Sequence, residues 1–175
     1  IGTEIDSELV ARARSLGLEA HASEAYIDSA IAGRALDLAV CFDVLEHLTV
    51  EEIVVLLSGL RRALKPGGRI LARFPSGDSP FGGSVQNSDI THKTVIGSGM
   101  VQQFAGKAGL TLVQIREPAF PLRGVGLLRA VRRLAVLLLR KILSMAIKTA
   151  FHDGQALVMT RNMVAVWAAD EGSPR

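Results

Sequence analysis

A group of acidic and histidine side chains follows a short apolar run that ends at Phe42. Asp43, Glu46 and His47 are spaced i, i+3 and i+4, which would place all three on one face of a helix. Another histidine, His92, occurs in a long segment rich in glycine, serine and proline, which predicts a functional loop. Because histidine titrates near neutrality, His47 or His92 is our candidate for a general base.

The same side chains allow two other roles. Two carboxylates and two imidazoles could bind a divalent metal ion, with Asp43, Glu46, His47 and His92 as ligands. Alternatively, Glu46 and His47 could hold the long loop in place by hydrogen bonds. We favour this bracing role over metal binding, so the sequence predicts a site that requires no metal.

The elements that would position these residues alternate between strands and helices. Strands are expected at residues 1–5, 19–21, 36–42, 69–74, 110–115 and 156–168, and helices at 7–16, 49–64, 98–108 and 122–151. This order predicts an α/β fold with a doubly wound, mostly parallel sheet, covered by helices on both faces and closed by an antiparallel last strand. Ligands of such sheets bind at the carboxyl ends of the strands, where the histidine group would lie.

The composition is that of one globular domain. The 175 residues are 49% hydrophobic and 21% charged, so residues 1–175 can form a single domain with its own core. Cys41 is the only cysteine, which excludes an intrachain disulfide and favours a reducing, cytoplasmic location.

Residues 122–151 form an inserted basic segment with a helical pattern. Arg129, Arg132, Arg133, Arg140, Lys141 and Lys148 fall on one half of the helix, and leucines and other apolar residues fall on the other. The helix could pack on the sheet with its basic half in solvent, which we favour, or it could contact an anionic membrane surface peripherally. No aromatic residues interleave with the arginines, so we do not expect nucleic-acid binding.

Two longer strings complete the pattern. Residues 37–48 read DLAVCFDVLEHL, and residues 60–70 read LRRALKPGGRI. Together with the opening IGTEID, and with HKT at 92–94, they resemble the class I S-adenosylmethionine-dependent methyltransferases, of the branch that modifies small molecules, glycans or quinones. The resemblance implies S-adenosylmethionine as cofactor and a Rossmann-like fold.

The resemblance also implies cofactor contacts. Glu4 would bind the ribose hydroxyls, as an acid after the second strand of a nucleotide-binding unit does, and Ile5 would pack on the adenine. Ser23 and Glu24 stand where the family contacts the adenine amine. The residues implied at the end of the next strand are Cys41, Phe42 and Asp43. For Cys41 we favour the role of a small buried side chain over that of a nucleophile.

One part of the family's pattern is absent. No strand with an acidic, glycine-rich loop precedes Glu4, although that loop holds the methionine half of the cofactor in the family. We therefore expect this chain to be a fragment that is itself inactive and binds cofactor weakly, with the missing unit ahead of Ile1.

The function expected from the resemblance is O-methylation of a small molecule, glycan or lipid-linked precursor. One alternative is a non-catalytic methyltransferase-like module that docks on a membrane or protein partner through its basic helix. Another is a nicotinamide-dependent oxidoreductase, because Glu4 would also suit the ribose of that cofactor. The location would be cytoplasmic or membrane-peripheral.

Overall fold

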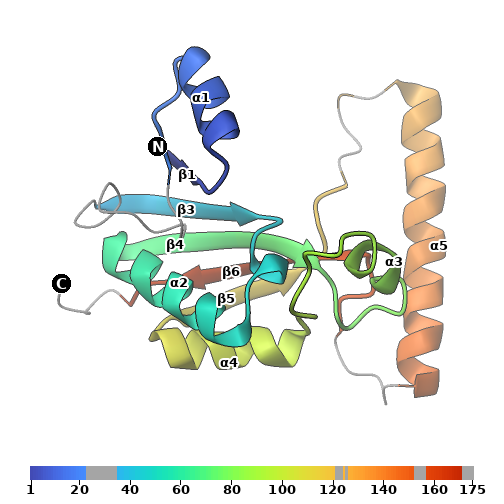
Figure 1. The fold of residues 1–175 in the computed structure, drawn as a ribbon. Helices are drawn as coiled ribbons and strands as arrows, with labels where there is room; N and C mark the ends of the chain where they lie inside the picture. The colour runs from blue at the N-terminus through green and yellow to red at the C-terminus, as the bar shows by residue number, and fades with distance from the viewer. Residues whose placement is uncertain (23–34, 121–123, 125, 152–156, 171–175) are drawn as a thin grey trace.

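The computed structural model describes residues 1–22, 35–120, 124, 126–151 and 157–170. Its strands form two sheets (Figure 1). The smaller sheet pairs β1 with β2 in parallel, and the larger has the order β3-β4-β6-β5. In the larger sheet β3 and β4 are parallel, and β6 is antiparallel to both of its neighbours, which confirms the predicted mixed sheet with an antiparallel last strand. The strand bounds are β1 Gly2–Glu4, β2 Ala20–Ala22, β3 Leu36–Phe42, β4 Leu64–Pro75, β5 Thr111–Arg116 and β6 Asn162–Ala168.

Local sequence signals set most helix ends. Thr49 accepts a hydrogen bond from the Glu52 amide at 3.3 Å while Glu52 accepts one from the Thr49 amide at 2.7 Å, which forms a capping box. Gly109 ends its helix with φ 67°, a left-handed conformation that favours glycine. The helices are α1 Ser7–Ser15, the 3-10 turn η1 Leu45–His47, α2 Val50–Ala63, α3 Gly83–Gln86, α4 Ser98–Ala108 and α5 Leu127–Phe151.

The last strand is shorter than its sequence pattern suggests. β6 begins at Asn162 rather than at residue 156, and Asn162 pairs with Pro75, the last residue of β4. An apolar run can extend as a strand only where a neighbouring strand accepts its hydrogen bonds, and the neighbour ends there.

The core lies on one face of the larger sheet. α2 and α4 cover this face (Figure 1), with Ile53, Leu57, Val101 and Trp167 fully buried. The prediction that helices cover both faces is wrong for the described residues. Leu38, Val40 and Phe42 point to the other face of β3, where no described helix covers them and each is about half exposed.

The two sheets are separated by a cleft. Among the described residues no hydrogen-bonded ladder joins β1 to β3, although the two strands face each other. The cleft has a volume of about 230 Å³, and Ile1, Gly2, Leu38 and Val40 are among the residues that line it. The cleft therefore opens beside the residues to which the resemblance assigns the cofactor.

β4 begins at Leu64 rather than at residue 69, where the sequence predicted it to begin. Its residues Lys65-Pro66-Gly67-Gly68 lie at a register shift against β3 and contain two glycines with different requirements. Gly67 has φ 73°, which favours glycine, but space is open around it. At Gly68 a Cβ atom would lie 2.9 Å from the carbonyl oxygens of both Leu36 and Lys65. Gly68 therefore allows the start of β4 to lie directly against β3, which is a structural role.

Gly68→Ala should destabilise the fold by about 1–3 kcal/mol, the usual cost of forcing atoms into a packed site. The measurement is the free energy of unfolding in urea. The control is Gly99→Ala in the first turn of α4, where nothing lies within 4 Å of the added Cβ, and which should be neutral or stabilising. Equal effects at the two positions would contradict the close-approach argument.

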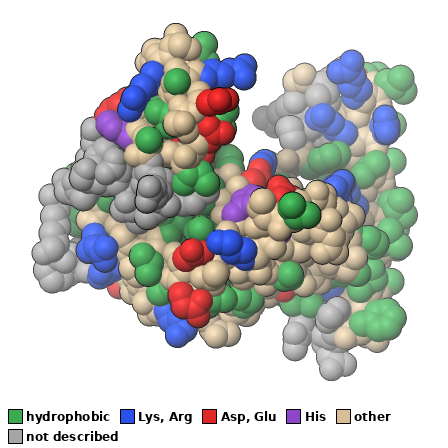
Figure 2. All heavy atoms as spheres, in the orientation of Figure 1, with side chains coloured by type: hydrophobic (Ala, Val, Ile, Leu, Met, Phe, Trp, Pro, Cys, Tyr) green, Lys and Arg blue, Asp and Glu red, His purple; other side chains and the backbone are tan. Residues whose placement is uncertain are grey.

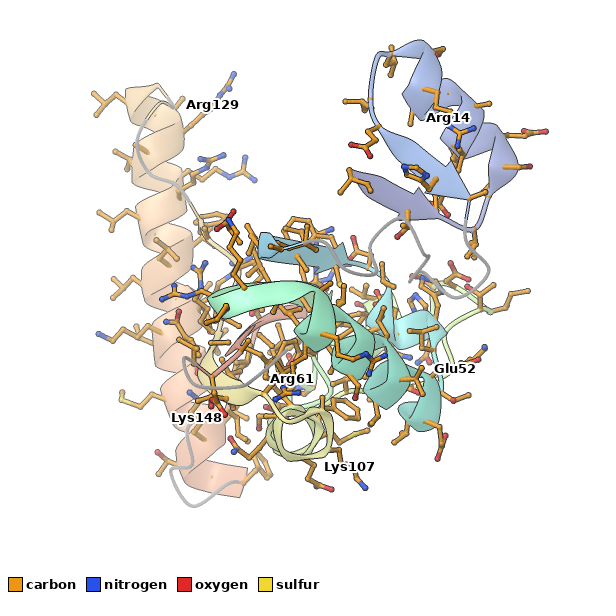
Figure 3. All side chains as sticks on the ribbon, turned by 90° about the vertical axis from the view of Figure 1, so that its left-hand side faces the viewer. Arg14, Glu52, Arg61, Lys107, Arg129 and Lys148 are labelled. Carbon is orange, nitrogen blue, oxygen red and sulfur yellow. The ribbon has the colours of Figure 1, made fainter. Side chains whose placement is uncertain are left out.

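The long helix α5 stands apart from the rest of the domain in two perpendicular views (Figures 1 and 3). None of its described residues is buried. It makes no extended packing contact with any other described helix or strand. In the described part of the chain, no helix combines the length and apolarity needed to cross a membrane.

Candidate active site

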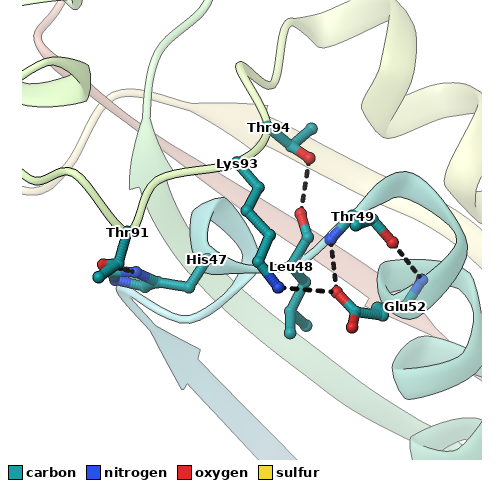
Figure 4. Close-up of polar contacts among 7 residues, drawn as sticks. All are labelled: His47, Leu48, Thr49, Glu52, Thr91, Lys93 and Thr94. Atoms are coloured by element: carbon teal, nitrogen blue, oxygen red, sulfur yellow. Dashed lines mark hydrogen bonds and ion pairs between the residues drawn. The ribbon is translucent and has the colours of Figure 1, made fainter.

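The candidate site forms at the carboxyl ends of β3 and β4. β3 leads through Asp43 into η1, and β4 leads into the loop of residues 76–97, which folds back over η1. The backbone carbonyl of Glu46 accepts hydrogen bonds from the amides of Lys93 at 2.7 Å and Thr94 at 3.2 Å. The Thr94 hydroxyl donates to the carbonyl of Leu48 at 2.6 Å (Figure 4). The loop predicted from composition is thus fixed against η1 at several points.

The two histidines of the site lie against each other. The rings of His47 and His92 meet edge to face, with centroids 4.7 Å apart. His92 Nδ1 lies 2.7 Å from the carbonyl oxygen of Gln86, which can only accept, so this nitrogen carries the proton. When the imidazole is neutral, the lone pair of His92 is therefore on Nε2.

A short chain of hydrogen bonds orients the other ring. The Thr91 hydroxyl donates to Asp89 Oδ1 at 2.7 Å. The same hydroxyl lies 2.8 Å from His47 Nδ1 (Figure 4). Because its proton is used on Asp89, Thr91 accepts from the Nδ1–H of His47, and Nε2 again carries the lone pair. The two hydrogen bonds from Thr91 hold the pKa of Asp89 below its usual range, so that carboxylate stays ionised as the last acceptor of the chain.

Glu46 is the most buried acid of the group. Its side chain is 2% exposed, and Oε2 has no hydrogen-bond partner among the described residues. Burial raises the pKa of Glu46 because the charged form loses its hydration. Ligand atoms of Glu46, His47 and His92 all lie within 4.8 Å of one another. A buried carboxylate without a partner beside two oriented imidazoles is an arrangement that a cation or a polar substrate group could complete.

Asp43 does not join this group, so the prediction of one helical face for Asp43, Glu46 and His47 is wrong. Asp43 has φ 55° and precedes the 3-10 turn, which changes the direction of the chain before Glu46. Its carboxylate instead forms an ion pair with Arg73 through both guanidinium positions Nε and Nη2. A positive φ at a residue other than glycine marks a constrained position, and such positions concentrate at functional sites.

Arg73 and the bracing loop residues were not identified from the sequence. Arg73 could have been found only from the register of β3 and β4. That register pairs Arg73 with Phe42, the residue before Asp43. Its guanidinium also lies over the Phe42 ring, 5.0 Å from the centroid. Thr91 and Asp89 carry no recognisable spacing to His47, because the loop alone brings them together.

The residues assigned to the cofactor line the end of β1 and the end of β3. Glu4 is half-buried and accepts hydrogen bonds from the amides of Ile5 at 2.8 Å and Asp6 at 3.2 Å, both through Oε1. Among the described residues, no hydrogen bond to Oε2 is found. Ile5 is 53% exposed and free to contact a flat ring. Ser23 and Glu24 lie outside the described residues.

At the end of β3, Phe42 and Asp43 are exposed while Cys41 is buried. Burial raises the pKa of the Cys41 thiol to about 11, so the thiolate is scarce at neutral pH. Cys41 is therefore a small side chain of the core rather than a nucleophile.

Comparison with known proteins identifies this arrangement. Residues 1–72 match the family model described as a methyltransferase domain. The first part of the chain is therefore similar to a methyltransferase domain. The fold is that of the class I S-adenosylmethionine-dependent methyltransferases.

Solved structures of S-adenosylmethionine-dependent methyltransferases align with nearly the whole chain. One from Archaeoglobus fulgidus has a TM-score of 0.63 and 16% identity, over 95% of this chain and 74% of that protein. One from Clostridium acetobutylicum has a TM-score of 0.59 and 10% identity, over 96% and 74%. One from Mesorhizobium loti has a TM-score of 0.56 and 12% identity, over 95% and 78%. No curated protein matches the sequence.

Proposed function

We propose that this chain belongs to a methyltransferase that uses S-adenosylmethionine as its cofactor and transfers the methyl group to a hydroxyl oxygen of a small molecule, a glycan or a lipid-linked precursor. The observation that carries the proposal is the pair of oriented imidazoles, whose Nδ1 atoms are both engaged and whose Nε2 atoms are left to accept protons. An alcohol or phenol oxygen must lose its proton as it attacks, so a base at the site favours an oxygen acceptor.

The bound cofactor supplies the methyl carbon on a positively charged sulfur. With the cofactor bound, Nε2 of His47 or His92 would take the proton of the acceptor hydroxyl as its oxygen attacks the methyl carbon, and the neutral thioether would be the leaving group. Asp89 and Thr91 position the His47 ring, and the Gln86 carbonyl positions the His92 ring. The chain's main task is to hold the acceptor in line with the methyl carbon.

A second candidate is a metal-assisted transfer at the same place. It is favoured by the unpartnered Oε2 of buried Glu46 and by ligand atoms from three side chains that lie within 4.8 Å of one another. A divalent ion would help an acceptor hydroxyl to ionise by withdrawing charge from its oxygen. Asp43 is not among these ligands, because Arg73 holds its carboxylate.

The test is a transfer assay with methyl-labelled S-adenosylmethionine and a panel of acceptors. At least one class of hydroxyl acceptor, among phenols, sugars and lipid-linked sugars, should become labelled. Amine and thiol analogues of that acceptor should become labelled far less. EDTA should leave the rate unchanged if histidine alone acts as the base, and should abolish it if the metal is required. Saturable cofactor binding, measured by calorimetry, with no transfer to any acceptor would instead favour a non-catalytic module.

A further inference from the structure

We propose that α5 lies flat on an anionic lipid surface, with its outward apolar face in the boundary between headgroups and acyl chains. For this inference the apolar face is defined as Leu128, Val131, Leu134, Leu138, Leu139, Ile142 and Met145. These side chains are between 52% and 85% exposed. The inference does not depend on the proposed methyl acceptor.

A helix that packs on its own domain turns its apolar face toward the core. In α5 the apolar face points away from the domain. Figure 2 shows hydrophobic side chains along the edge of α5 that points away from the sheet. Part of the basic half faces inward, where the guanidinium groups of Arg133 and Arg140 lie 5.4 and 5.1 Å from the centroid of the Phe120 ring. Packing with the basic half in solvent, which the sequence favoured, is therefore not what the structure shows.

The inward contact is loose. A cavity of about 420 Å³ lies between α5 and the body, lined from the helix by Arg140, Leu143 and Ser144 and from the body by Phe81 and Met159, among others. The arginine–ring contacts thus fix the orientation of α5 without burying its apolar residues. Exposing a continuous apolar face of this size in water is unfavourable, and it marks an interaction surface.

Charge favours a lipid surface over a second copy of this chain. Between Glu117 and Asp153 the sequence has seven Lys or Arg residues and no acid. At about 100° per residue, Arg132 and Lys141 fall on opposite borders of the apolar face, where they could reach phosphates on either side. Two such helices placed face to face would repel each other, with no acidic partners to pair. Anionic lipid offers both an apolar layer and negative charge.

The placement has a consequence for the site. Figure 1 shows α5 beyond the ends to which β3 and β4 point, with α3 and its loop between. Gly77 and Phe81 of this loop share a second cavity with Ile147 and Phe151 of α5. A membrane under α5 would therefore lie near the carboxyl edge of the sheet, from which an acceptor must approach.

Vesicle sedimentation of the whole chain tests the proposal. The protein should pellet with vesicles of phosphatidylcholine and 30% phosphatidylglycerol, less with phosphatidylcholine alone, and less when the salt concentration is raised. Arg132→Glu with Lys141→Glu should lower the partition coefficient at least about 25-fold, since each basic residue near the surface contributes about fivefold. The matched control is Arg62→Glu with Lys107→Glu, exposed cations of α2 and α4 with the same change in net charge.

The apolar face is tested separately. Leu138→Glu with Ile142→Glu should abolish pelleting, whereas Val55→Glu, a 68% exposed side chain on α2, should not. The fluorescence of a tryptophan placed by Met145→Trp should be quenched by brominated lipid, whereas the emission of Trp167 should stay constant because this residue is fully buried. Circular dichroism should show each variant folded.

Three outcomes would overturn the proposal. The first is no pelleting with anionic vesicles. The second is pelleting that the α5 variants and their controls reduce equally. The third is a concentration-dependent dimer, seen by light scattering, that Leu138→Glu disrupts and that added vesicles do not dissociate. That result would assign the apolar face to a second copy of this chain.

Discussion

Replacing His92 by alanine should lower kcat by about 100-fold or more, the usual contribution of a positioned general base. The reason is the geometry of its ring, in which Nδ1 is held by the Gln86 carbonyl and Nε2 is left for a substrate proton. His47→Ala should have a comparable effect if His47 is the base and a smaller one if it only supports its neighbour. The measurement is the initial rate of methyl transfer by the full-length protein that contains this chain, with and without the substitution, at saturating cofactor.

A conservative variant separates catalysis from bracing. In His92→Asn the side-chain amide can still donate to Gln86, but it cannot accept a proton as a base. If His92 is the base, the asparagine and alanine variants should be equally slow. If His92 only braces the loop, asparagine should restore much of the rate. The control is His21→Ala, a histidine of β2 outside the histidine pair.

The pH dependence should have a definite sign. A protonated imidazole cannot accept the acceptor's proton, so the rate of the unaltered chain should fall as pH is lowered. That acid limb should be absent from the residual activity of the variant that lacks the base. Wild-type rates in both alanine variants would remove histidine from the chemistry and leave it a structural role.

Replacing Trp167 by alanine should lower the free energy of unfolding by about 3–5 kcal/mol, the range for large aromatic residues in a core. Trp167 is fully buried on β6, where it pairs with Ile70 of β4 on one side and Leu112 of β5 on the other. Domains of this size are stable by only about 5–15 kcal/mol, so the variant should unfold at much lower urea concentration.

Two further variants show how much of the stability lost in Trp167→Ala comes from the indole hydrogen bond and how much from the apolar volume. Trp167→Phe keeps most of the apolar contact but removes the indole N–H that donates to the Val101 carbonyl at 3.3 Å. It should cost about 1 kcal/mol for the hydrogen bond, plus the smaller volume. Val55→Ala, at an exposed position on α2, should cost almost nothing. A loss below about 1 kcal/mol for Trp167→Ala would show that the site collapses around the missing ring.

The fold followed closely from local patterns. Leu36–Phe42 and Ser98–Ala108 begin and end where their sequence signals place them, because apolar periodicity, the Gly97 and Gly109 boundaries and the end of an apolar run act over a few residues. The Thr49–Glu52 capping box likewise needs no distant partner. The local patterns missed the start of β4 at Leu64 and the length of β6, both of which depend on where a neighbouring strand offers hydrogen-bond partners.

The candidate site divides in the same way. The sequence by itself determined which chemical groups are present, the loop that carries His92 and the family to which the motifs point, since these depend on residue types and short spacings. Only the tertiary structure decided that His47 and His92 share one place while Asp43 turns away to Arg73. It also decided that α5 turns its apolar face outward. Those outcomes depend on the positive φ of Asp43 after β3, on the register of β3 and β4, and on contacts between segments far apart in the chain. No short stretch of sequence contains both partners of such contacts.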